Sequence, residues 1–191
     1  MTATATRKPP ADAGLRALPA LLQNGEGWAD LRAALAAGKS GTVDGAWGSS
    51  AALATAALVL DAPATVLVVI PNAADVGPWV EDITTFLGAR PAEFDAWEAW
   101  PVTSNKGKLD PTTTSRLRLL QELQKASAPR VVVCCAAAVC QPVPERADLA
   151  ARGRGLAVGE IVELGDLAEW LVQNGYKRVE AVEYPGEFSR R

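Results

Sequence analysis

"ATVLVVIPN", residues 64–72, is the stretch that decides the fold, because aliphatic and β-branched side chains follow one another there without a polar break. A short apolar run bounded by Pro63 and Pro71 is typical of a strand buried on both faces of a parallel sheet. "RVVVCC", residues 130–135, repeats the pattern. Two such strands in a 191-residue chain that is 49% hydrophobic predict an α/β core.

Apolar residues at three- and four-residue spacing predict helices around these strands, at 15–24, 28–38, 49–60, 74–88 and 112–126. Two further short strands are expected at 40–46 and 92–97. Asp110 and Pro111 supply a cap and a first-turn residue for the last helix, and Gly88 supplies a helix stop. The alternation of strand and helix predicts an α/β fold with a mainly parallel sheet flanked by helices.

Three regions are expected along the chain. Residues 1–13 are small, polar and proline-containing, which predicts a disordered tail. Residues 14–143 form the α/β module, and residues 144–191 begin a smaller α+β unit. In that unit 156–164 and 176–191 alternate in the manner of antiparallel strands, and 165–175 is an amphipathic helix. Because residues 144–191 are too few to form much of a core, we expect the chain to be a fragment of a longer protein.

Composition excludes several classes of function. The chain has no histidine, which removes histidine-based acid–base catalysis and histidine zinc sites. The net charge of −3 gives no overall attraction to nucleic acid. Cys134, Cys135 and Cys140 lie in an apolar run and are expected to be buried and reduced rather than metal ligands. Without a signal peptide or an apolar span, the sequence indicates a cytoplasmic protein with no membrane contact.

"GAWGSSAALATAAL", residues 45–58, has the position of a phosphate-binding loop between a strand and a helix. Such a loop has the form G-x-x-x-x-G-K-[ST]. With Gly45 as the first glycine, the second glycine, the lysine and the hydroxyl fall on three residues that cannot replace them: Ser50, Ala51 and Ala52. Serine adds a Cβ where glycine allows a positive φ, and the two alanines remove the phosphate cation and the magnesium ligand.

A magnesium nucleotide is therefore not expected here, and the fragment is predicted to have no catalytic residue, no metal and no cofactor of its own. The free amides of the helix start would attract an anion only weakly. Gly45 and Gly48 alone are also compatible with an ordinary strand-to-helix turn.

Three stretches together resemble the N-terminal, UvrB-like module of bacterial transcription-repair coupling factors, the Mfd family. They are "GSSAALATAAL" (48–58), "DAWEAWP" (95–101) followed by "DPTTTSRLRLLQEL" (110–123), and "GYKRVEAVEYPGEFSRR" (175–191). The resemblance implies a degenerate P-loop NTPase-like layer similar to UvrB domain 1a, followed by the start of the UvrA-binding domain 2. Only nine residues, 101–109, separate "EAW" from Asp110, which leaves no room for the DNA-clamping β-hairpin of UvrB.

The same resemblance implies a role in nucleotide excision repair. The module would dock UvrA, hold the parent protein in an autoinhibited state, and help to recruit UvrA to RNA polymerase stalled at DNA damage. Arg191 matches the family's UvrA contact, and Arg190 would share the role if the register slips by one. Helicase-like ATP hydrolysis, with its ATP and magnesium, and contacts with DNA and RNA polymerase would belong to other domains of the parent.

Two alternatives stay open. One is a UvrB-like or helicase-like P-loop domain that still binds ATP and damaged DNA, and the other is a stand-alone doubly wound domain without a repair role. A solvated chain terminus is the alternative for Arg190 and Arg191.

Six tryptophans at scattered positions are expected in core or interface packing rather than base stacking. Arg116, Arg118 and Lys125 are expected on the solvated face of one helix.

Overall fold

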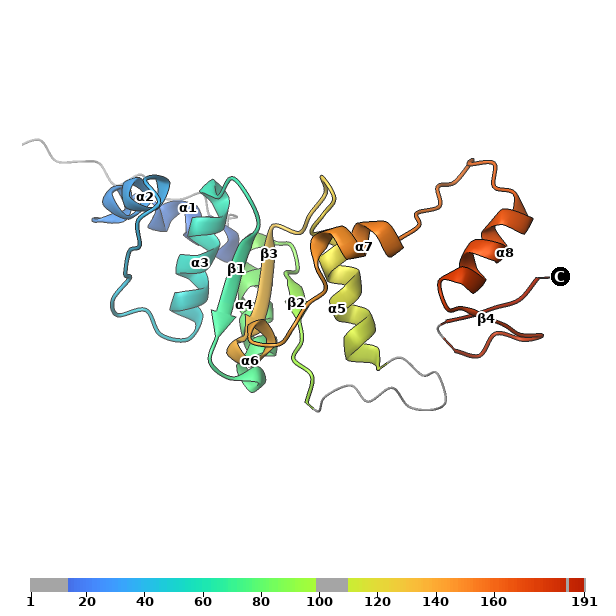
Figure 1. Ribbon diagram of the computed structural model, residues 1–191. Coiled ribbons are helices and arrows are strands. Elements are labelled where there is room, and N and C mark those ends of the chain that lie inside the picture. Colours follow the sequence, from blue (N-terminus) through green and yellow to red (C-terminus); the bar gives the residue numbers. More distant parts are fainter. Residues whose placement is uncertain (1–13, 99–109, 185, 191) are drawn as a thin grey trace, which may run out of the picture.

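The computed structural model describes residues 14–98, 110–184 and 186–190. Its centre is a parallel sheet of three strands in the order β1-β3-β2, formed by Val66–Ile70, Val131–Cys135 and Ala92–Phe94 (Figure 1). Val133 of β3 lies opposite Val68 of β1 and Glu93 of β2. The α/β class and the parallel sheet expected from the sequence are therefore confirmed.

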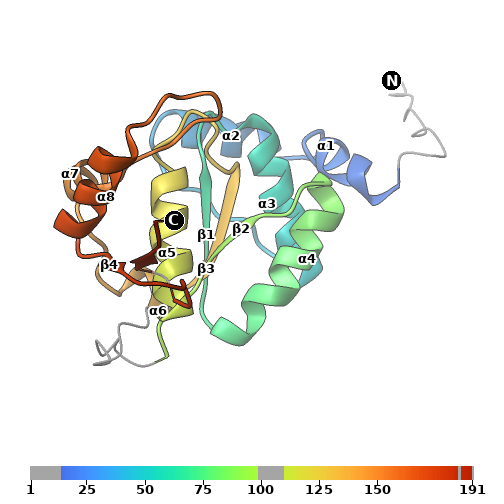
Figure 2. The ribbon, with the colours of Figure 1, turned by 90° about the vertical axis from the view of Figure 1, so that its right-hand side faces the viewer.

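Helices cover both faces of this sheet (Figure 2). The helices α3 (Ser49–Asp61) and α4 (Val76–Leu87) pack on one face, and α5 (Pro111–Glu122) lies against the other. Short helical segments connect them: η2 (Ala73–Asp75) leads into α4, and α6 (Ala136–Val139) follows β3 directly. This arrangement follows from right-handed crossovers between parallel strands.

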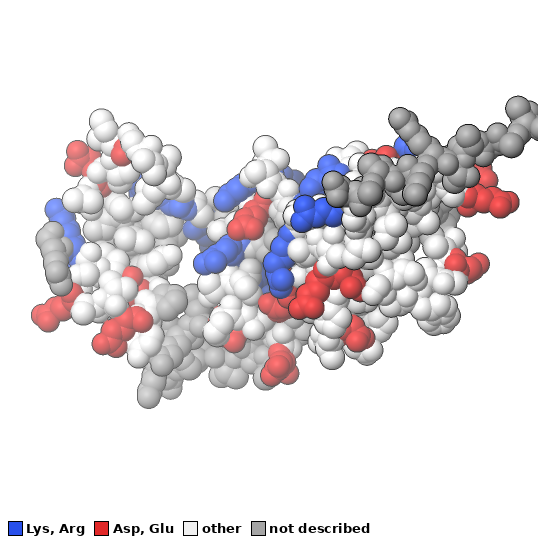
Figure 3. Space-filling model, turned by 180° about the vertical axis from the view of Figure 1, so that it is seen from behind, with Lys and Arg blue, Asp and Glu red and all other residues white. Residues whose placement is uncertain are grey.

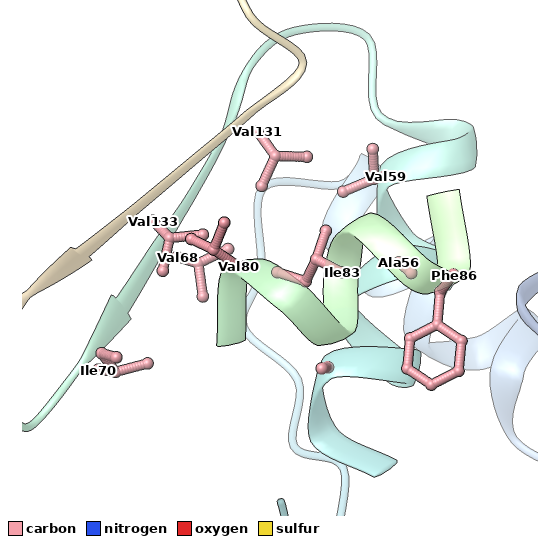
Figure 4. Packing of buried hydrophobic residues seen from close by; sticks show 10 residues of the cluster. Ala56, Val59, Val68, Ile70, Val80, Ile83, Phe86, Val131 and Val133 are labelled. Atoms are coloured by element: carbon pink, nitrogen blue, oxygen red, sulfur yellow. The ribbon is translucent and has the colours of Figure 1, made fainter. Parts of the chain in front are cut away.

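The main core lies between the sheet and the α3–α4 layer (Figure 4). Val80 and Ile83 of α4 are fully buried against Val68, Val133 and Ala56. A second cluster fills the space under α5, where Phe94 and Leu119 meet Val132 and Cys134. Because successive side chains of β3 point to opposite faces, this central strand contributes to both clusters.

The N-terminal segments pack against α3 and α4. They are η1 (Leu15–Ala17), α1 (Leu18–Leu22) and α2 (Trp28–Ala36), as the helical spacing predicted. Gln23 donates from Nε2 to the Ala57 carbonyl at 2.8 Å, and Arg32 pairs with Asp61 at 2.9 Å. These contacts fix the helices beside the main core.

Two helix ends confirm their expected caps. Thr113 donates its backbone N–H to Asp110 Oδ2 at 2.9 Å, and Pro111 occupies the first turn of α5. Gly88 ends α4 with a φ of 73°, in the left-handed region that favours glycine.

Two of the expected strand features in the α/β module are wrong. Residues 40–46 form no strand, because Thr42 and Val43 are the only β-branched pair there and Val43 is exposed. The strand β1 is buried on one face only: Leu67 and Val69 are about half exposed, at 55% and 48%. Leu67 instead lines an apolar groove of about 410 Å³ between β1 and α5. An apolar run predicts a strand with packed side chains on both faces, but β1 lies at the edge of the sheet and is packed on one face only.

The C-terminal region consists of α7 (Arg146–Arg152), α8 (Leu164–Gln173), β4 (Lys177–Arg178) and β5 (Glu187–Phe188). The helix α8 confirms its prediction, but 156–164 forms no strand, and β4 and β5 pair in parallel rather than antiparallel. Alternation of polar and apolar residues indicates that one face of a strand is exposed, but it does not indicate whether neighbouring strands are parallel or antiparallel. No described residue from 144 to 190 is buried, so the core belongs to the α/β module.

The expected disordered tail, residues 1–13, lies outside the described residues. The short connection at 101–109 also lies outside them. Within the described ranges, no helix is long and apolar enough to cross a membrane.

Candidate functional site

The phosphate-loop position lies at the carboxyl edge of the sheet. Figure 1 shows the carboxyl ends of β1 and β3 at the same lower edge as the first residues of α3. In open α/β sheets this is the edge at which ligands bind. The position of Gly45–Ala52 therefore agrees with that of a phosphate loop, although no strand precedes it among the described residues.

The turn before α3 is held by hydrogen bonds and differs from the expected frame. Gly45 and Gly48 take φ values of 74° and 54°. Ser50 lies within α3, and among the described residues only glycines have a positive φ. The positive φ that a glycine would allow at residue 50 is therefore not needed there, since it falls at Gly48. Ser50 Oγ accepts from Trp47 N at 2.7 Å and donates to Trp47 O at 2.8 Å, which holds the turn closed.

The first amides of α3 are already occupied. Ser50 donates its backbone N–H to Trp47 O at 3.2 Å, and Ala51 donates to Gly48 O at 3.0 Å. Ala52, at the position of the magnesium-binding hydroxyl, is 1% exposed and belongs to the main core. This side chain faces the main core, so even a hydroxyl at residue 52 would point away from a ligand outside the turn.

Trp47 itself is 83% exposed, whereas Trp28 is 6% exposed and packs in the N-terminal helices. Trp79, Trp97 and Trp170 are half-buried, and Trp100 lies outside the described residues. Of the expected core or interface packing, the core part is confirmed for Trp28, and Trp47 lies outside the core.

Arg116 was expected on the solvated face of α5, and this expectation is wrong. Its side chain is 2% exposed and lies between two rings, with Cζ 4.0 Å from the centroid of Phe94 and 4.3 Å from that of Trp97. It donates to Asp95 O at 2.6 Å and to Ala138 O at 3.4 Å. Burial lowers the pKa of the Arg116 guanidinium, and the Asp95 carboxylate opposes this shift.

Helical phase could have indicated this burial, because Arg116 lies three residues before the buried Leu119. Its partners come from β2 and α6, which sequence spacing does not place beside α5. Arg118 and Lys125 are exposed, as predicted. In Figure 3, Lys and Arg side chains gather near the middle of the face, with Asp and Glu among and around them, so no uninterrupted basic surface is visible there.

Arg116 belongs to a network that joins the end of β2 to the start of α5. Trp97 donates from Nε1 to Thr113 Oγ1 at 2.9 Å. The Gln141 amide accepts from Trp97 N at 2.8 Å and donates to Trp97 O at 2.9 Å, as a neighbouring strand would. These bonds brace the carboxyl edge of the sheet.

The cysteines separate into two kinds. Cys134 and Cys135 are buried, as expected, while Cys140 is exposed, contrary to the expectation. Burial raises the pKa of the Cys134 thiol, and Cys135 adds to the shift while Arg116 opposes it. Within the described part of the chain, no three His, Cys, Asp or Glu side chains are grouped to hold a metal ion.

The C-terminal arginines form a separate candidate site. Arg190 is exposed and lines an open hollow of about 470 Å³ together with Arg178, Val179, Glu180 and Ser189. Arg191 lies outside the described residues. Sequence reasoning named Arg190 but missed Arg178, which only the pairing of β4 with β5 brings beside it.

The fold defines the chain as an α/β protein with a small parallel sheet flanked by helices, and α3 begins at the carboxyl edge of that sheet. No family model matches the chain, and no curated protein matches it significantly in sequence.

Proposed function

We propose that the chain is the N-terminal module of a bacterial transcription-repair coupling factor, with an α/β layer similar to UvrB domain 1a. In this role it catalyses no reaction. It docks UvrA, contributes to autoinhibition of the parent protein, and recruits UvrA to RNA polymerase stalled at DNA damage.

The observation that carries the proposal is the helix start of α3. A nucleotide site needs a cation for the phosphates and a hydroxyl for the metal. Here Ala51 replaces the first, and Ala52, buried in the core, replaces the second. A turn that keeps its position but has lost both groups favours a docking module over a motor.

Nucleotide binding tests this step. Titration of the chain with magnesium and a fluorescent ATP analogue should give no saturable binding in the micromolar range. Micromolar binding that is abolished by Gly48→Val would instead establish the alternative, a UvrB-like domain that still binds ATP.

Docking is tested separately by titrating UvrA against the immobilised chain. We expect saturable binding that Arg191→Ala weakens, because arginine forks onto carboxylates at interfaces. Absence of binding to the chain, with its secondary structure confirmed by circular dichroism, would refute UvrA docking and favour a stand-alone domain. Full retention of binding by the variant would remove Arg191 from the site.

A further inference from the structure

We infer that two copies of the chain form a dimer in which residues 157–161 of each copy, the apolar turn, insert into the groove between β1 and α5 of the other. The groove and the apolar turn are both hydrophobic, and no described side chain covers either of them. This inference goes beyond the proposed function and does not depend on it.

The groove has a volume of about 410 Å³ and lies between Leu67 of β1 and Leu123 at the end of α5. Among the described residues that line it, none is charged, and the two polar ones are already engaged. Thr65 donates from Oγ1 to a backbone carbonyl at 2.7 Å, and the Gln141 amide bonds at both ends to the backbone of Trp97. The groove therefore offers little to a polar or charged ligand, and its occupant should be apolar.

The apolar turn has a fixed shape and presents two hydrophobic side chains. Ala157 donates its N–H to Glu160 Oε2 at 3.0 Å, and Glu160 donates its N–H to Ala157 O at 3.2 Å. Gly159 has a φ of 90°, which closes the turn at a position that favours glycine. Val158 and Ile161 lie almost entirely in solvent. Because the turn is already formed, it loses less conformational freedom on binding than a free segment would.

The position of α7 keeps the apolar turn away from the groove of its own chain. Gly153, which follows α7, lies beside the Gln121 side chain of α5. Gln121 is exposed and lies two residues from both Leu119 and Leu123, which places it about half a turn around α5 from these groove residues. In Figure 1 the chain continues from α7 away from β1, with α5 between them.

The distance along the chain leads to the same conclusion. The four residues from Gly153 to Ala157 span at most about 14 Å, which is little more than the width of a helix with its side chains, about 10–12 Å. The apolar turn thus does not pass around α5 into its own groove while α7 stays in place. A second copy has no such restriction, and a two-fold axis lets both copies exchange their turns in two equal contacts.

Chemical cross-linking tests which copy supplies the apolar turn. Cys140 is exposed and lies between Val139 and Gln141, which both line the groove, and Ala157→Cys adds a thiol to the exposed turn. With a short bismaleimide we expect a covalent dimer of this variant, which is lost when Cys140→Ser is added. Ala181→Cys, at an exposed position outside the turn, should give no such dimer. A link within one chain, or no link, would overturn the inference.

Sedimentation velocity of the full chain measures the dimer itself. We expect a dimer that forms with rising concentration and that Ile161→Asp or Leu67→Asp each weaken about tenfold or more, because either variant places an unpaired charge in an apolar contact. Leu123→Asp serves as a second groove variant, and circular dichroism verifies the fold of each. Val182→Asp, at an exposed apolar position outside the turn, should change the dissociation constant less than about twofold.

A mixture of two variants distinguishes this contact from general association of apolar surfaces. Ile161→Asp keeps its groove and Leu67→Asp keeps its turn, so the mixture should form a heterodimer through one intact contact at a concentration where neither variant dimerises alone. A chain that stays monomeric, a mass above that of two chains, or a mixture no stronger than its components would overturn the inference. None of these results alters the test of UvrA docking, which is measured on its own.

Discussion

Replacing Arg116 with methionine should destabilise the α/β module, although the change removes a buried charge. Methionine fills the space between Phe94 and Trp97 with an unbranched chain, so the variant removes mainly the hydrogen bonds and the ring contacts of the guanidinium. The buried carbonyl of Ala138 loses its donor, which costs about 1–3 kcal/mol. The two cation–π contacts contribute about 0.5–2 kcal/mol each.

Part of this loss is offset, because methionine carries no charge and its burial therefore costs no desolvation free energy of the kind that the guanidinium has. We therefore expect the free energy of unfolding to fall by about 2–3 kcal/mol. Urea unfolding followed by circular dichroism and tryptophan fluorescence measures it, and the midpoint should fall by about 1 M with an unchanged slope. Arg118→Met, at an exposed position on the same helix, should change stability by less than about 0.5 kcal/mol. Equal or greater stability of Arg116→Met would show that the desolvation of the guanidinium outweighs its contacts.

Three further outcomes follow from the same structure. Asp110→Ala removes the cap of α5 and should cost about 1 kcal/mol in urea unfolding, with Asp110→Ser restoring most of it. In the native chain a disulfide reagent should modify Cys140 rapidly, while Cys134, buried and with a raised pKa, should react only after denaturation; rapid modification of all three thiols would contradict the packing. Ala51→Lys with Ala52→Thr should not create a magnesium-nucleotide site in a fluorescent ATP titration, because threonine at a core position with 1% exposure costs about 1–3 kcal/mol and directs its hydroxyl inward. Nucleotide binding by that double variant would show that the turn retains the geometry of a phosphate loop.

The centre of the fold could be predicted from the sequence because its determinants are local. The strands β1 and β3 are continuous apolar runs, and α5 carries its own cap at Asp110. The edge position of β1 could not be predicted, since a run such as "VLVVI" is equally apolar whether one face or both are covered. Exposure of Leu67 and Val69 depends on how far α5 extends over the sheet, which is a tertiary property.

The candidate sites were likewise predictable only where their determinants are local in the sequence. The absence of a lysine and a hydroxyl at Ala51 and Ala52 is visible in the sequence, but the burial of Ala52 depends on the packing of α3 against α4. The charge pattern of α5 predicted that Arg116 is solvated. This prediction is wrong because the rings that enclose the guanidinium come from a segment about 20 residues earlier, outside the helix. Arg178 was missed because a parallel pairing of β4 with β5 has no mark in an alternating sequence.

The buried core and the surface proposed for recognition lie in different parts of the chain. Every buried side chain among the described residues lies before residue 144, whereas Val158, Ile161 and Leu164 after it are strongly exposed. Burial of apolar area is the main stabilising term in folding, so the α/β module supports itself and the C-terminal unit gains little from its own packing. Its exposed apolar residues supply area that a partner can bury.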